Sequence, residues 1–155
     1  MSRLPANVVI DGVIYGVRAT VEEIHVNEGV VDIGYGTSCG CPRLHTVVLP
    51  QSLRTIGIGA FIHCHALKSI NIPPSVTTIG KGAFARCSAL KSINLPPSVT
   101  TIGEAAFQNM SSLQTLELPS SVTSIGYNAF FGASSLQSIK VNSNNINYSS
   151  DNFGV

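Results

Sequence analysis

The residues best suited to chemistry are cysteines and histidines in the first half of the chain. Cys39 and Cys41 form a CGC triplet, and His63, Cys64 and His65 form an HCH triplet. Zinc binds four such sulfur and nitrogen ligands in a tetrahedral array. The spacing fits no zinc-finger pattern, and residue alternation would turn the two histidines away from Cys64. We therefore expect no metal ion and no cofactor.

Catalytic groups are also scarce. The chain contains many serines and four histidines, but it has no nucleophile elbow, phosphate loop or clustered pair of carboxylates. Glu104 and Glu117 occupy different positions in the repeat described below, so we expect them on different faces. The sequence therefore predicts that the protein is not an enzyme.

Charged residues make up only 11% of the chain, against about 25% in typical soluble domains, and the net charge is +1. This balance gives no reason to expect nucleic acid or an anionic membrane as the main partner. No apolar stretch reaches the ~20 residues that span a bilayer, so we expect no membrane insertion. The opening MSRLPANVVIDGV lacks the apolar core of a signal peptide, which leaves the cellular location open.

The charges are distributed unevenly. Up to Asp32 there are two bases and five acids, residues 33–103 hold six bases and no acid, and Lys140 is the one base beside three acids from Glu104 onward. Sparse charges on a solvated surface explain this pattern most simply. The alternative is a weakly basic middle, which could attract an acidic partner.

The chain repeats itself every 23 residues without insertion or deletion. The two most similar units read LKSINIPPSVTTIGKGAFARCSA and LKSINLPPSVTTIGEAAFQNMSS. A period of this length is typical of a solenoid, in which each unit buries its apolar face against its neighbours. We predict an α/β repeat solenoid of about five full units plus a partial one. The units are 21–43 (a degraded copy), 44–66, 67–89, 90–112, 113–135 and the segment from Leu136.

Each unit begins with the pattern LxxIxLP, which predicts a first strand. In unit 67–89, alternation would point Leu67, Ile70 and Ile72 inward and the intervening residues outward. Pro73 has no N–H to donate, so it should end the strand. The motif SVTTIG follows and predicts a second short strand.

The remainder of each unit, GAFARCSAL in unit 67–89, predicts a short helix that packs an Ala, a Phe and a Cys inward. The glycine before it, Gly80 and its equivalents Gly57, Gly103 and Gly126, is expected at a sharp turn that needs φ > 0. One phenylalanine per unit predicts a continuous apolar column. Its members are Phe61, Phe84, Phe107 and Phe130.

Three cysteines share one position of the repeat. Cys41, Cys64 and Cys87 stand where Met110 and Ala133 stand in later units. Replacement by Met and Ala indicates a site that needs a small apolar side chain. We expect these cysteines to be buried and reduced, although neighbouring coils bring them close enough that distance alone does not exclude oxidation.

The repeat motif LPxSVTxIGxxAFxxC resembles that of the BspA-like leucine-rich repeats, most strongly over residues 44–135. The resemblance implies a right-handed leucine-rich-repeat coil with short strands and short helices. It also implies a capping hairpin at 1–20, a repeat array at 21–141 and an Asn/Ser-rich segment at 142–155, within one domain. Members of that family are mostly surface-exposed or secreted, and some act in adhesion.

The outward positions of the first strands form the most varied columns, and solenoids commonly bind partners on such a face. We predict a protein-interaction module with a protein or glycan partner, of an adhesion or surface-recognition type. The face has no aromatic residue of the kind that dominates tight interfaces, so binding by one copy should be modest. The candidate residues are His45, Lys68, Asn71, Lys91, Asn94, Gln114, Glu117, Gln137 and Lys140.

Two other functions are considered. The C-terminus shows no evident polar cap, so end-to-end stacking into a homo-oligomer is the alternative to a binding module. Rows of threonine on the second strands, such as Thr77 and Thr78, occur on ice-binding solenoids. The simpler interpretation of these rows is strand propensity.

Overall fold

Apolar and polar residues alternate at two places in each unit, and each place forms a short strand. In the computed structural model, the described residues are 9–10, 13–14, 20–35, 37–38 and 40–150. The strands are β1 (Val9–Ile10), β2 (Val13–Ile14), β3 (Glu23–His25), β4 (Asp32–Ile33), β5 (Thr46–Val48), β6 (Thr55–Ile56), β7 (Thr78–Ile79), β8 (Ser92–Asn94), β9 (Thr101–Ile102), β10 (Thr115–Leu118), β11 (Ser124–Ile125) and β12 (Ser138–Val141).

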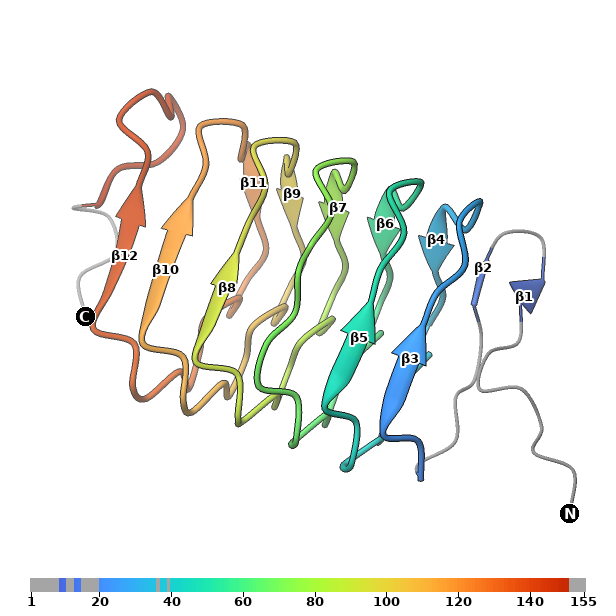
Figure 1. Ribbon diagram of the computed structural model, residues 1–155. Coiled ribbons are helices and arrows are strands. Elements are labelled where there is room, and N and C mark those ends of the chain that lie inside the picture. The colour runs from blue at the N-terminus through green and yellow to red at the C-terminus, as the bar shows by residue number, and fades with distance from the viewer. Residues whose placement is uncertain (1–8, 11–12, 15–19, 36, 39, 151–155) are drawn as a thin grey trace, which may run out of the picture.

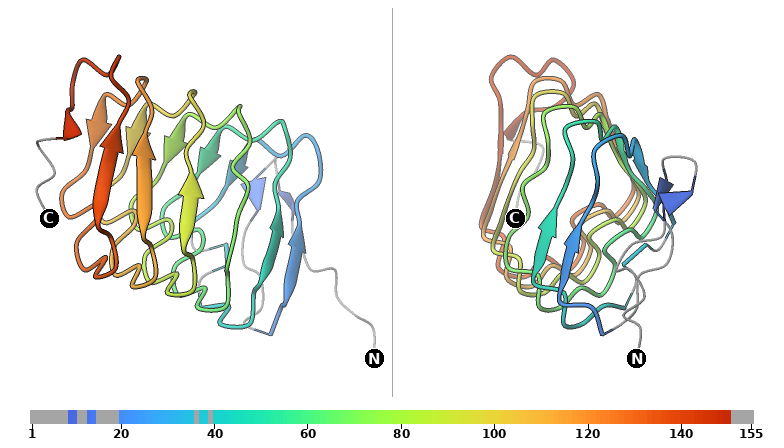
Figure 2. Two further views of the ribbon diagram at one scale, coloured as in Figure 1. Left: turned by 60° about the vertical axis from the view of Figure 1, so that its left-hand side comes forward. Right: turned by 45° about the vertical axis from the view of Figure 1, so that its right-hand side comes forward.

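The strands line two opposite sides of a flattened solenoid (Figure 1). The second strands form one continuous sheet in the order β1-β2-β4-β6-β7-β9-β11, in which all pairs except β1–β2 are parallel. From β4 onward the partners are 23 residues apart, as in Ile56↔Ile79 and Ile79↔Ile102. The sequence period therefore corresponds to one turn of the coil, and Figure 2 shows these coils nested along the stack.

The first strands form the opposite side, in two groups, β3-β5 and β12-β10-β8. The unit between them contributes a single bridge, Asn71↔Asn94, rather than a strand. Leu67, Ile70 and Ile72 in this unit are nevertheless buried, as alternation predicts. We call the solvent side of these strands the first-strand face.

Between the sheets lies an apolar core whose columns run along the solenoid. The rings of Phe61, Phe84, Phe107 and Phe130 are stacked at centroid distances of 5.5, 5.8 and 5.6 Å. The first three rings are fully buried, and Phe130 in the last full unit is partly buried. The phenylalanine column predicted from the sequence is confirmed.

The prediction of short helices is wrong, because no α-helix occurs in the described residues. The segment after Gly80 instead places Gly82 and Arg86 in the left-handed region, at φ 61° and 63°. Backbone N–H groups there alternate between two acceptors. Ala83, Ala85 and Cys87 donate three residues back, while the residues between them donate to the next coil, as in Phe84 N to Ala106 O at 2.9 Å. A helix would need those donors for its own i→i−4 bonds, so inter-coil bonding replaces the helix.

The expectation of positive φ at Gly80 and its equivalents is also wrong. Positive φ values among these units fall on other residues, such as Gly59 and Gly82. At Gly80 the need for glycine is close packing, since an added Cβ would lie 2.7 Å from the Gly57 carbonyl carbon and 2.8 Å from the Ile58 nitrogen. Glycine therefore allows neighbouring coils to approach, rather than allowing the chain to turn.

The first full unit departs from the pattern. Thr37 and Ser38 take the places of the Ala–Phe pair, and both are buried. The Thr37 hydroxyl donates to Gly34 O at 2.8 Å, whereas the buried Ser38 hydroxyl has no hydrogen-bond partner among the described residues. The phenylalanine column thus begins only at Phe61.

Both ends of the stack are covered to some extent. The β1–β2 hairpin continues the second-strand sheet through β4. At the other end, Asn145 Nδ2 donates to Pro119 O and Val122 O at 3.0 and 3.1 Å, and Tyr148 Oη accepts from Ile125 N at 3.1 Å. The last coil therefore has a polar cap that the sequence pattern did not predict. The division into residues 1–20, 21–141 and 142–155 stays a prediction.

Candidate partner-binding face

All nine predicted residues lie in or just before the first-strand segments of their units, on the solvent side. Each of them is exposed, and the apolar residues between them, such as Val47, Ile93 and Leu116, are buried. Neighbouring strands lie about 4.8 Å apart, so the residues form ladders across the coils. The nine are His45, Lys68, Asn71, Lys91, Asn94, Gln114, Glu117, Gln137 and Lys140.

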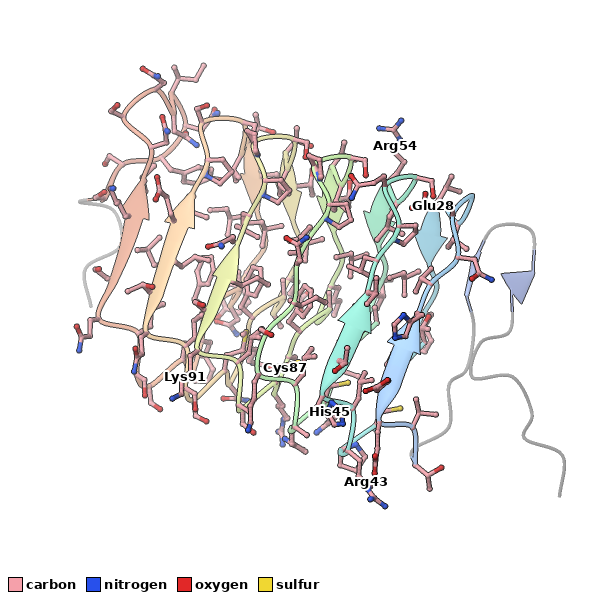
Figure 3. The ribbon with its side chains drawn as sticks, viewed as in Figure 1. Glu28, Arg43, His45, Arg54, Cys87 and Lys91 are labelled. Carbon is pink, nitrogen blue, oxygen red and sulfur yellow. The ribbon has the colours of Figure 1, made fainter. Side chains whose placement is uncertain are left out.

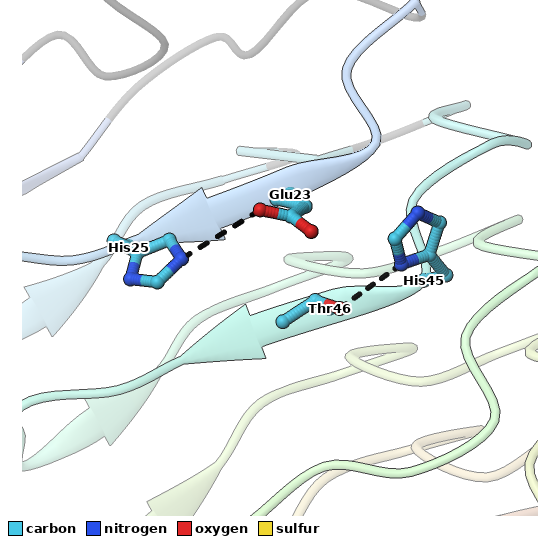
Figure 4. A network of polar contacts seen from close by, with 4 residues as sticks. All are labelled: Glu23, His25, His45 and Thr46. Carbon is cyan, nitrogen blue, oxygen red and sulfur yellow. Dashed lines mark hydrogen bonds and ion pairs between the residues drawn. The ribbon is translucent and has the colours of Figure 1, made fainter.

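The two ends of this face make contacts within the chain. Glu117 and Lys140 on adjacent strands form an ion pair at 4.0 Å. At the N-terminal end, His45 Nδ1 lies 3.0 Å from Thr46 Oγ1, and His25 Nε2 lies 4.0 Å from Glu23 Oε2 on the neighbouring strand (Figure 4). These exposed contacts contribute little to stability.

The centre of the face is different. Lys68, Asn71, Lys91 and Asn94 form two identical pairs on adjacent coils. Within the described part of the chain, none of these four side chains has a hydrogen bond or an ion pair. Ammonium and amide groups are thus presented to solvent in a regular array, with their hydrogen-bonding capacity unused within the described chain.

Basic groups also gather along the edge where one coil passes to the next. Figure 3 places Arg43, His45 and Lys91 along this edge and Arg54 on the opposite one. The rings of His63 and His65 lie 5.6 Å apart in an edge-on arrangement. The pKa of His63 is lowered below its ordinary value. Burial is the largest cause, and repulsion from the charges of Arg86 and His65 adds to it.

A second surface was missed by sequence reasoning. The turn segments form a mainly apolar groove of about 320 Å³, whose lining includes Tyr35, Ile58, Ile62 and Gly82. Tyr35 is 76% exposed. The sequence pattern did not predict this surface because it indicates a helix for these residues, and a helix would have packed them differently. The sequence did contain a signal for it. Tyr35 and Ile58 share a repeat position with Lys81, and Ile62 shares one with Ala85, so these units carry larger apolar side chains there.

The cysteines behave as packing residues. Cys41, Cys64 and Cys87 are free thiols and fully buried. Burial raises the pKa of Cys87 to about 12, and its Sγ donates to Phe61 O at 3.1 Å. Cys39 lies outside the described residues. Among those that are described, no group of three His, Cys, Asp or Glu side chains could hold a metal ion.

The outer threonine row of the second strands is used within the fold. The hydroxyls of Thr77, Thr100 and Thr123 each lie 3.3–3.4 Å from a carbonyl oxygen of the preceding coil, to which they donate. Internal hydrogen bonding therefore accounts for this row without an ice-binding role.

Comparison with known proteins agrees with this architecture. A leucine-rich repeat protein of T. pallidum is 32% identical, with a TM-score of 0.78 over 82% of this chain and 62% of that one. A leucine-rich cell surface protein of Faecalibacterium prausnitzii is 30% identical, with a TM-score of 0.77 over 97% and 44%. The pneumococcal vaccine antigen PcpA is 28% identical, with a TM-score of 0.73 over 83% and 32%. The chain spans less than two thirds of each of these proteins.

No curated protein gives a significant match. No helix in the described part of the chain is long and apolar enough to cross a membrane. The family model for the BspA-type leucine-rich repeat region matches residues 31–154 in six copies. The chain therefore belongs to the BspA-type leucine-rich repeat family.

Proposed function

We propose that the chain is a non-enzymatic protein-interaction module of an adhesion or surface-recognition type, which binds its partner through the first-strand face. The observation that carries the proposal is the centre of this face. Lys68, Asn71, Lys91 and Asn94 are exposed, in register, and without a partner among the described residues. The F. prausnitzii relative is described as a cell surface protein, which supports a role in surface recognition.

The exposed columns support the proposal in a second way. The inward columns are nearly uniform because packing dictates them, as the four stacked phenylalanines illustrate. The outward columns are not constrained by packing, so their residues can be set by a partner. Polar ladders on a rigid scaffold suit recognition of another surface, and the chain offers no catalytic constellation to support an enzyme.

End-to-end assembly is the weaker alternative. It needs strand edges with unpaired N–H groups at the last coil. Tyr148 Oη accepts from Ile125 N, and Ser150 Oγ accepts from Val141 N at 3.1 Å. These side chains satisfy backbone donors that a stacked copy would use.

The test begins with capture of partners from the protein's native environment, followed by measurement of affinity for each captured protein. Changing Lys68, Asn71, Lys91 and Asn94 together to Ala should weaken binding at least tenfold. The matched control changes four exposed residues in or directly before strands of the opposite sheet, Arg54, Thr100, Thr123 and Ser124, to Ala and should leave affinity unchanged. Unaltered binding by the face variant contradicts the proposal, and so does an equal loss in the control.

A further inference from the structure

A cluster of basic side chains lies at the edge between the turn segments and the first-strand face. We call it the basic stripe, and it consists of His63, His65, Lys68, Arg86 and Lys91. The motif HxHxxK (63–68) recurs as RxSxxK (86–91) exactly one repeat later. Stacking places the two copies side by side, since His63 N donates to Ala85 O at 2.9 Å and His65 Nδ1 lies 3.2 Å from Ser88 Oγ.

The permanent charges of the stripe have no acidic partner in the described residues. The ion pairs of the described chain use other bases, namely Arg43 with Glu22, Lys81 with Glu104 and Lys140 with Glu117. Lys68, Arg86 and Lys91 form none, and no acid occurs between residues 33 and 103. Three cations on adjacent coils repel one another, so an anion bound between them would relieve that repulsion.

We propose that the basic stripe binds a short acidic polypeptide segment, a run of about three or four Asp or Glu residues. The inference rests on the proposed function, because it specifies the chemistry of the partner on the same face. Arg86 can donate paired hydrogen bonds to one carboxylate, while Lys68 and Lys91 attract others as point charges.

The length of the segment follows from the charge distribution along the solenoid. The stripe crosses about two coil spacings of ~4.8 Å each, roughly 10 Å in all. An extended polypeptide advances about 3.3 Å per residue, so three or four residues span it. Beyond the stripe lie Glu22 and Glu23 on one side and Glu117 on the other, all exposed. A long polyanion, such as a sulfated polysaccharide or a nucleic acid, would extend over these carboxylates and be repelled.

Acidification should strengthen binding. Burial, and then the charge of Arg86, hold the pKa of His63 below its usual 6.5, whereas Asp and Glu remain ionised down to about pH 4. A bound carboxylate offsets the charge of Arg86, so it favours the protonated form of His63, and by linkage a lower pH strengthens binding of an acidic ligand that is still ionised. Arg86 and His65 face His63, and Ser88 faces His65, so no carboxylate of the described chain neutralises the added charge.

The experiment measures fluorescence anisotropy of a labelled Gly/Ser peptide that carries four consecutive Glu residues, and of the same peptide with four Gln. The full chain is titrated into each at low salt, at pH 7 and pH 5.5. The stripe variant carries Lys68→Gln, Arg86→Gln and Lys91→Gln. The control carries Arg54→Glu and Lys81→Gln, which removes the same net charge of three at places outside the stripe and the first-strand face.

The Glu peptide should bind and the Gln peptide should not. Affinity for the Glu peptide should rise at least threefold at pH 5.5, fall at least tenfold in the stripe variant, and change less than twofold in the control. Absence of binding at millimolar protein, or equal losses in the two variants, overturns the proposal. Tighter binding of heparin than of the peptide through the same residues also overturns it, and would assign the stripe to a polysaccharide. If the Glu peptide does not bind, but the variant of the first-strand face still loses affinity for its captured partner, the proposed function stands and this inference alone is wrong.

Discussion

The close approach of the coils gives a sharp prediction at two glycines that are two residues apart. Gly80→Ala places a Cβ 2.7 Å from the Gly57 carbonyl carbon and 2.8 Å from the Ile58 nitrogen. Both neighbours are backbone atoms of a coil held in place by the hydrogen bond from Gly80 N to Ile56 O at 2.7 Å. Overpacking typically costs about 1–3 kcal/mol, and a backbone neighbour yields less than a side chain. We expect a loss of about 3 kcal/mol.

Gly82→Ala is the matched control. Gly82 has φ 61°, but the nearest atom to its added Cβ is Ala85 Cβ at 4.0 Å, so there is room. A left-handed alanine costs about 1–2 kcal/mol, and the smaller entropy of the unfolded chain offsets about 0.4–1 kcal/mol of that. The equivalent residue of the next unit, Ala105, already adopts φ 54°. We expect a loss of about 1 kcal/mol or less.

Thermal and urea unfolding, followed by circular dichroism, compare the two variants with the unchanged chain. At about 2–4 °C per kcal/mol, Gly80→Ala should lower Tm by roughly 6–12 °C, and Gly82→Ala by about 4 °C or less. The urea midpoint should move in the same order. If Gly82→Ala proves as costly as Gly80→Ala, conformation rather than coil packing determines the need for glycine, and our explanation is wrong.

Four further predictions concern the core and its titratable groups. Phe84→Ala removes the centre of the ring stack and should cost about 3–5 kcal/mol in urea unfolding; a loss under 1 kcal/mol contradicts the packing described. Ser38→Ala removes a buried hydroxyl without a partner and should leave Tm unchanged or raise it, so a clear decrease would reveal a bond we do not see. The folded pKa of His63 is lowered, so the unfolded chain binds more protons and stability falls as pH drops through about 6.5. Asn109 occupies the same repeat position as His63 and has a similar left-handed backbone, so His63→Asn should be tolerated there. This variant should flatten the decline of Tm between pH 7.5 and 5.5, and an unchanged slope would refute the explanation. Because burial raises the pKa of Cys87 to about 12, its thiol should resist alkylation in the native state and react on unfolding; rapid native labelling detected by mass spectrometry contradicts this burial.

Much of the fold follows from the repeat. The period sets the register of the strands within the repeats, because each residue pairs with the one 23 positions away, as Ile56 does with Ile79. Alternation identified the buried residues, such as Leu67 and Ile70, and the exposed ones, such as Lys68. These features depend on local pattern and burial, both of which are visible in residue types.

The errors arose where contacts between coils decide the conformation. Residues such as Ala85 and Arg86 favour helix in isolation, yet Arg86 adopts φ 63° while its N–H donates to Gln108 O of the next coil. The packing role of Gly80 likewise appears only when coils are stacked. The C-terminal cap depends on the Asn145 amide reaching Pro119 O, a contact that no local motif indicates.

For the candidate face, the sequence could predict which side chains are exposed, but not what kind of partner binds them. Alternation placed Asn71 and Asn94 outward, and the structure agrees. The nature of a partner depends on how charges from different coils meet in space. Arg86 and Lys68 come from opposite ends of one unit, and only the coil brings the former beside His63 of the preceding unit.

The central claim, that partners bind on the first-strand face, is tested most directly by photo-crosslinking. A photoreactive amino acid replaces exposed Ser92 on β8 of that face in one variant, and exposed Thr123 beside β11 of the opposite sheet in a second. Each variant is irradiated with its captured partner, and the crosslinked product is quantified by mass spectrometry. We predict strong crosslinking from position 92 and little from position 123. Crosslinking from position 123 alone would contradict the proposed binding face.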